Sequence, residues 1–218
     1  MNFYLVISLS LSIVIPALIG LIRFKKINEA YHPFIIFIWV GAINEIFGVI
    51  IMYIHNSNIV NLNIYLLIES FLLLWQFTRW GILSKRSFWI PLLSIVFIIF
   101  WVTENFIVYR ITRYDSWFMI FYSALFTFMS ISAINKLLVT ERKSLTRNPV
   151  FIICAAFVIY FTTIILSEVF WVYGISQNDT FASKVYAISV IINFISIIFY
   201  TLAILWMPIK HRFTLPSS

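Results

Sequence analysis

Residues 33–54 read PFIIFIWVGAINEIFGVIIMYI, an unbroken run in which Glu45 is the only charged side chain. A helix of this length, at about 1.5 Å per residue, crosses the roughly 30 Å hydrocarbon core of a bilayer. The apolar residues are continuous rather than alternating, which favours a helix that satisfies its own backbone within lipid. Six similar runs are Phe3–Ile22, Leu62–Leu83, Phe88–Val108, Trp117–Leu138, Pro149–Tyr173 and Val185–Met207. We therefore predict an all-α polytopic membrane protein with seven transmembrane helices.

The composition of the chain agrees with this prediction. Of its 218 residues, 62% are hydrophobic and 11% are charged, whereas soluble domains average about 45–50% and about 25%. The net charge of +7 comes from short clusters between the apolar runs, where basic residues meet lipid headgroups. We expect one seven-helix domain over residues 1–218, with no soluble domain, the lipid bilayer as its surroundings and no nucleic-acid partner. The single Cys154 excludes an internal disulfide.

The connecting segments alternate in charge along the chain. Basic residues gather after the first, third, fifth and seventh runs, whereas the other segments are nearly neutral. The basic residues are Arg23, Lys25, Lys26, Arg79, Lys85, Arg86, Lys136, Arg142, Lys143, Arg147, Lys210 and Arg212. The positive-inside rule then predicts an N-out, C-in orientation. We expect a multi-pass protein of the plasma (inner) membrane.

Three carboxyl groups lie within the predicted spans: Glu45, Glu69 and Glu168. Charged residues in hydrocarbon are expensive and often mark functional sites. The structural alternative is a protonated carboxyl that hydrogen-bonds to a neighbouring helix. All three residues lie in the predicted outer half, and no Lys or Arg lies in the middle of a span to balance them. We therefore predict that the three carboxyl groups converge on one cavity that is open to the outside.

Helical spacing adds polar neighbours to this predicted site. Tyr65 precedes Glu69 by one turn, so its hydroxyl can bond the carboxyl or share a ligand with it. Gln76 lies on the same face, and we expect it to join helices together. Tyr186 and Asn193 belong to a polar stripe on the last span. The predicted ligand- or ion-binding residues are Glu45, Tyr65, Glu69, Glu168, Tyr186 and Asn193.

Local signals refine the expected helix packing. Pro16 lacks a backbone donor and can kink the first span. Gly41 and Gly48 share a face with Glu45 and permit close approach of a neighbouring helix. The segment at Glu45-Ile46-Phe47 is similar to Glu168-Val169-Phe170. This similarity suggests a three-plus-one-plus-three parallel-repeat bundle, although chance explains so short a match equally well.

Catalytic motifs are absent from the sequence. His32, His55 and His211 fall in loops and the tail, and no HExxH, GxSxG or glycine-rich nucleotide loop occurs. We predict no catalytic residue, no metal site and no cofactor. An enzyme that uses a carboxylate as general acid or base on a lipid-like substrate is the least favoured hypothesis, because neither a nucleophile nor a metal set accompanies the carboxyl groups.

Two hypotheses for function therefore lead. In the first, the chain transports or binds a proton, a cation or a small polar solute through an outward-facing acidic cavity. In the second, it is a sensor or accessory subunit whose ligand occupies the same cavity. The second hypothesis needs a membrane or cytoplasmic partner protein, since only residues 208–218 follow the last span.

Overall fold

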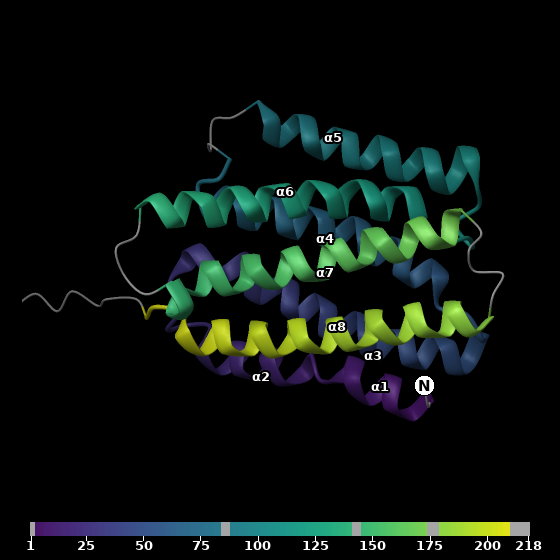
Figure 1. Ribbon diagram of the computed structural model, residues 1–218, viewed down its shortest axis with the longest axis horizontal. Coiled ribbons are helices and arrows are strands. Elements are labelled where there is room, and N and C mark those ends of the chain that lie inside the picture. The colour runs from purple at the N-terminus through teal and green to yellow at the C-terminus, as the bar shows by residue number, and fades with distance from the viewer. Residues whose placement is uncertain (1–2, 84–87, 141–144, 174–178, 210–218) are drawn as a thin grey trace, which may run out of the picture.

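The computed structural model describes residues 3–83, 88–140, 145–173 and 179–209 (Figure 1). Its regular elements in this part of the chain are helical. The α-helices are α1 Phe3–Leu11, α2 Val14–Arg23, α3 His32–His55, α4 Ile59–Arg79, α5 Trp89–Val102, α6 Ser116–Thr140, α7 Pro149–Val172 and α8 Asp179–Trp206. Short 3₁₀ helices cover Glu29–Tyr31 and Leu145–Arg147, and a π-helix, η2, covers Thr103–Val108.

Seven helices are long and apolar enough to cross a membrane, which confirms the predicted fold class. They cover Tyr4–Arg23, Glu29–His55, Ile59–Arg79, Trp89–Val108, Ser116–Thr140, Pro149–Val172 and Phe181–Trp206. Two spans differ most from their predicted boundaries. The third span begins at Ile59 and ends at Arg79, close to Gly81 with its positive φ of 69°. The last helix begins at Asp179, because polar residues can continue a helix beyond its apolar run.

Six of the seven spans form a closed ring in chain order. The first span, formed by α1 and α2, contacts α3 and α8, while α3 contacts α4 and α4 contacts α6. Helix α7 lies between α6 and α8, as Figure 1 shows, and thereby completes the ring. Helix α5 packs against α4 and α6 at the edge of the bundle. The described contacts leave the parallel repeat as a prediction.

The first span is broken between α1 and α2. Pro16 has no N–H for the carbonyl of Ser12, and the turn before it tightens: Ile15 N donates to Ser12 O at 3.0 Å, and Ser12 N donates to Leu9 O at 3.3 Å. These i to i−3 bonds replace one helical turn. Ser10 and Ile13 on either side of the break line the cavity described below.

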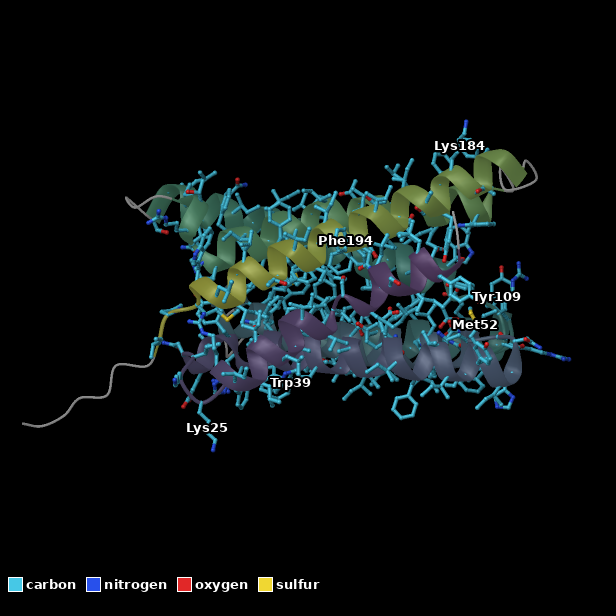
Figure 2. All side chains as sticks on the ribbon, turned by 90° about the horizontal axis from the view of Figure 1, so that it is seen from below. Lys25, Trp39, Met52, Tyr109, Lys184 and Phe194 are labelled. Atoms are coloured by element: carbon cyan, nitrogen blue, oxygen red, sulfur yellow. The ribbon has the colours of Figure 1, made fainter. Side chains whose placement is uncertain are left out.

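The two ends of the bundle differ in how many basic residues their connecting segments contain. We call the end with the α2–α3, α4–α5 and α6–α7 connections the basic end, and the opposite end, with the α3–α4, α5–α6 and α7–α8 connections, the acidic end. Figure 2 shows Lys25 at the basic end and Tyr109 and Lys184 at the acidic end. At the basic end, Arg23 donates to the carbonyls of Leu205 and Met207 at the end of α8. Cations are favourable at helix C-termini, so this contact helps close the ring. N-out orientation stays a prediction.

A layer of buried aromatic rings fills the bundle between its middle and the basic end. Phe157 lies at its centre, with ring centroids 6.1 Å from Phe37, 5.8 Å from Tyr200 and 5.5 Å from Phe161. We call this set the aromatic layer: Phe34, Phe37, Phe77, Phe126, Phe157, Phe161 and Tyr200, each at most 5% exposed. Rings at these separations pack favourably in edge-to-face and offset geometries. The layer closes the centre of the ring on its basic side.

Candidate functional site

A cavity of about 100 Å³ lies inside the ring, next to the aromatic layer on its acidic side. All six spans of the ring contribute to its lining, and α5 does not. Its polar lining residues are Ser10, Asn44, Glu45, Tyr65, Glu69, Tyr122, Tyr160, Asn193 and Tyr200. The structure thus brings four predicted site residues together: Glu45, Tyr65, Glu69 and Asn193. We call this space the central cavity.

Glu69 is the more buried of the two carboxyl groups of the central cavity. It is 3% exposed, and it lies ten residues after Ile59, or about 15 Å along α4. Tyr122 Oη donates a hydrogen bond of 3.2 Å to Glu69 Oε2. Sequence spacing pointed to Tyr65 as the partner on the same helix. The structure places Tyr122 there from α6, a contact between helices that no spacing within one helix can indicate.

Glu45 and Tyr65 line the central cavity from α3 and α4. The Tyr65 hydroxyl lies against Gly41, where an added Cβ would be 3.3 Å from that oxygen and 3.0 Å from Ile13 Cδ1. Gly41 therefore provides the room that this hydroxyl occupies. Next to it, Asn61 Nδ2 donates to Asn44 Oδ1 at 2.8 Å and joins α4 to α3. The close approach predicted from the glycines is present here.

The central cavity holds two carboxyl groups and no basic one. Among the residues that the structure describes, no Lys, Arg or His lines it. Tyr65 and Tyr160 each interact electrostatically with both Glu45 and Glu69, so the two carboxyl groups influence the same pair of hydroxyl groups. An ionised carboxylate without a partner in an apolar interior is strongly unfavourable. Among the described residues, neither carboxyl group therefore has a basic side chain in the cavity to balance a negative charge.

Glu168 and Tyr186 do not line the central cavity. They line a second cavity of about 410 Å³ between α6, α7 and α8, which opens toward the acidic end. Glu168 follows Tyr160 by eight residues, so it is rotated by about 80° around α7 from the centre of the ring. The predicted single site of three carboxyl groups is therefore divided in two. Met119 lines both cavities.

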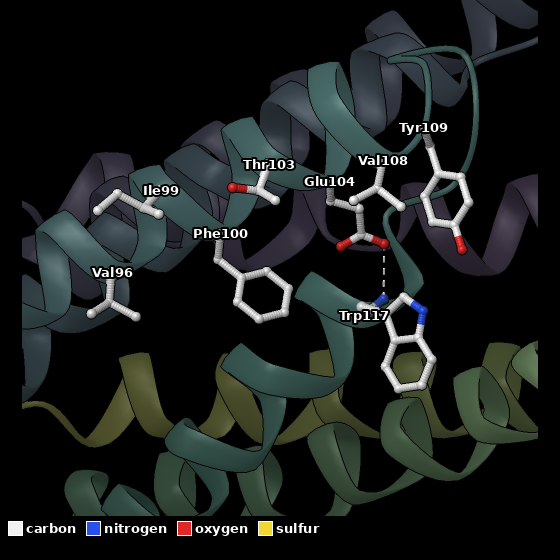
Figure 3. Close-up of a pocket in the computed structure, with 8 residues that line it drawn as sticks. All are labelled: Val96, Ile99, Phe100, Thr103, Glu104, Val108, Tyr109 and Trp117. Atoms are coloured by element: carbon white, nitrogen blue, oxygen red, sulfur yellow. Dashed lines mark hydrogen bonds between the residues drawn. The ribbon is translucent and has the colours of Figure 1, made fainter.

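Two further carboxyl groups hold the α5–α6 connection in place. Figure 3 shows Glu104 pointing at the backbone of Trp117, and its two oxygens accept the N–H groups of Trp117 at 3.0 Å and Phe118 at 2.7 Å. Glu104 therefore caps α6, as acidic groups do at helix N-termini. Glu104 also lines a groove of about 350 Å³ whose other side chains are mainly apolar. Because both of its oxygens already accept backbone hydrogen bonds, Glu104 does not offer a free polar group to this groove.

The second of these groups is Asp115, which is 1% exposed. Asn105 donates to its carboxylate from the π-helix, and Asn63 Nδ2 donates to Asn105 Oδ1 at 3.3 Å and to Arg113 O at 2.7 Å. The pKa of Asp115 is raised to about 6, mainly by burial. The hydrogen bond from Asn105 acts in the opposite direction, and nearby Glu104 adds to the increase. The wider turn of the π-helix lets both Glu104 and Asn105 face inward.

Gln76 has the structural role that we expected of it. Its Oε1 accepts the Phe34 N–H at 2.6 Å, and its Nε2 donates to Ala30 O at 2.8 Å. Phe34 is in the first turn of α3, where N–H groups lack a partner within the helix. Both polar ends of Gln76 are therefore occupied at the start of α3, on the basic side of the aromatic layer.

The chain matches no known protein family, no curated protein and no solved structure in comparisons with each. Within the described residues, no group of three or more His, Cys, Asp or Glu side chains is arranged to hold a metal ion. The central cavity and the second cavity are therefore interpreted from their own chemistry.

Proposed function

We propose that this chain binds a proton or a small cation at Glu45 and Glu69 and carries it, alone or with a small polar solute, across a plasma (inner) membrane. The observation that carries the proposal is the central cavity itself. It is built by every span of the ring around two carboxyl groups, and no described basic residue lines it. Tyr65 and Asn193 are its proposed further ligands.

The size of the central cavity supports a small occupant. Its volume of about 100 Å³ accommodates about three water molecules, at about 30 Å³ each. Cavities for drug-sized ligands have about 300–1,000 Å³. A hydrated proton or a dehydrated monovalent cation with one or two waters fits this space, whereas a sugar or an amino acid requires the helices to separate.

Transport further requires that the aromatic layer opens. Tyr200 and Phe37, which belong to the aromatic layer, line the central cavity on its basic side, and their ring centroids are 6.1 Å apart. In an alternating-access cycle these rings separate when the site turns to the basic end. The N-out orientation, part of this proposal, makes the acidic end the outer one.

A sensor or accessory subunit is the second candidate function. The closed aromatic layer favours it, since a ligand in the central cavity then has no open path to the basic end. Binding would instead shift the helices around the cavity for a partner protein in the membrane or cytoplasm.

Purified protein in liposomes that contain a pH-sensitive dye distinguishes the two functions. Transport predicts proton or cation flux that the Glu69→Gln variant abolishes. As a matched control, Thr163→Ala removes a hydroxyl that bonds only the Ile159 carbonyl within α7 and should retain the flux. Membranes that stay tight with the wild-type protein, under gradients of protons, Na⁺ and K⁺, would contradict transport and favour the sensor.

A further inference from the structure

The second cavity differs from the central one in size and chemistry. Its volume of about 410 Å³ falls within the range of small-molecule sites. Three aromatic side chains line it, from three different parts of the chain: Tyr114, Trp171 and Tyr186. Each of these is between 44% and 52% exposed, so the ring faces are accessible from outside the protein. One carboxyl group, that of Glu168, lies among them.

We infer that the second cavity is a binding site for an organic ammonium cation, held between the Glu168 carboxylate and the rings of Tyr114, Trp171 and Tyr186. Aromatic faces attract cations through their quadrupole, and cages of such rings are a known means of binding quaternary ammonium groups. The carboxylate supplies the opposite charge.

The position of Glu168 suits a charged group. It lies four residues before the end of α7, or about 6 Å from the acidic end of that helix, and its side chain, 7% exposed, lines the second cavity. Ser116 is a side-chain hydrogen-bond partner of Glu168. Tyr114, outside the spans, interacts with the same group: burial raises the pKa of Tyr114 to about 12, and Glu168 makes the largest of the electrostatic contributions that raise it further.

Two serine hydroxyl groups of the second cavity are already paired. Ser167 Oγ and Ser189 Oγ lie 2.8 Å apart, and Ser189 Oγ also donates to Val185 O at 3.1 Å. Tyr114, Ser116 and Tyr186 add further hydroxyl groups to the lining, and Glu168 provides its carboxyl group. Among the residues described, no Lys, Arg or His lines the cavity to neutralise it.

Other ligand classes fit this lining less well. A hard metal ion needs about six oxygen ligands at short range, and one carboxylate in a cavity of this size does not provide them. An anion would be repelled by Glu168, and a neutral apolar ligand would leave the carboxylate without a partner. An ammonium group with apolar substituents satisfies both the charge and the rings.

Free ammonium compounds and choline-containing lipid headgroups share this chemistry. Calorimetric titration of choline into the purified protein, in a detergent without ammonium groups, tests it. The neutral control is 3,3-dimethylbutan-1-ol, which replaces the quaternary nitrogen of choline by carbon. We expect choline to bind and the alcohol to bind at least about tenfold more weakly. Equal affinity for the two compounds would overturn the inference.

Two variants locate the binding. Glu168→Gln should weaken choline binding by about tenfold or more, and Trp171→Leu by about three- to tenfold. Trp75→Leu is the matched control, since Trp75 is similarly exposed at 41% but lies on α4 outside the cavity. If Glu168→Gln does not fold, the comparison of choline binding between Trp171→Leu and Trp75→Leu still tests the inference. Unchanged binding in both cavity variants would contradict the inference.

Experiments in nanodiscs distinguish the two possible sources of the cation, a lipid headgroup and a free ammonium compound. If the natural ligand is a headgroup, phosphatidylcholine nanodiscs should compete with choline and phosphatidylglycerol nanodiscs should not. Equal choline binding in both lipids indicates a free ammonium compound. Choline binding needs no flux, so this site can fail or succeed separately from the transport proposed for Glu69.

Discussion

Five helices serve different purposes in the acidic and basic halves of the bundle: α3, α4, α6, α7 and α8. On the acidic side of the middle, the helices contribute Glu45, Glu69 and Tyr122 to a small polar cavity. On the basic side, they contribute the aromatic layer around Phe157. In the first half polar groups face an open space, and in the second every ring is packed. The difference places an open polar space in one half and close packing in the other.

The largest expected effect concerns the packed half. Phe157→Ala removes a ring that contacts five others of the aromatic layer: Phe34, Phe37, Phe77, Phe161 and Tyr200. The resulting cavity should lower the free energy of unfolding by about 3–4 kcal/mol. Phe128→Ala is the control, since Phe128 is 70% exposed and should change it by less than about 1 kcal/mol. Thermal unfolding in detergent measures both, and equal losses would mean that the layer is not tightly packed.

The next prediction concerns pH and the acidic end. The raised pKa of Asp115, about 6, means that the folded state favours the protonated carboxyl. Its contribution to stability is therefore complete below about pH 4, the unfolded pKa, and is lost as the pH rises through about 6. The two-unit difference corresponds to at most about 3 kcal/mol.

Asp115→Asn checks this assignment. The amide cannot ionise, so the variant should lose the decrease in stability between about pH 4 and pH 7. Melting temperatures at several pH values provide the measurement. An unchanged pH profile in the variant would show that another group titrates in this range.

A smaller effect is expected at the start of α3. Gln76→Leu leaves the Phe34 N–H and the Ala30 carbonyl without their side-chain partner, which should cost about 2 kcal/mol. Thr78→Val is a control on the same helix, because the Thr78 hydroxyl bonds only the Leu74 carbonyl, and should cost less than about 0.5 kcal/mol. Chemical denaturation in mixed micelles measures the difference, and no difference would mean that water replaces the Gln76 contacts.

The seven spans could be predicted from the sequence because each is a nearly continuous apolar run. Their exact ends could not: Ile59 begins α4 within a polar segment, before the apolar run that predicted the span. Spacing also placed Tyr65 and Glu69 on one face, and both line the central cavity.

The contacts between helices were beyond the reach of spacing. Nothing in one helix indicates that Tyr122 would bond Glu69 or that Glu168 would rotate toward a separate cavity. The rotation of each helix is set by its neighbours around the ring, and small changes of angle move a side chain from one cavity to the next. Likewise, Glu104 reads as an interruption of the fourth span, and only the fold shows that it caps α6.

Reaction with dicyclohexylcarbodiimide tests the central claim most directly, because this reagent modifies protonated carboxyl groups in apolar surroundings. Peptide mass spectrometry then compares Glu69 with Glu104, whose two oxygens both accept backbone hydrogen bonds. We predict rapid modification of Glu69, slow modification of Glu104, and protection of Glu69 by rising pH or by the cation that it binds. A Glu69 that stays unmodified at every pH in folded protein, or reacts no faster than Glu104, would contradict a proton- or cation-binding central cavity.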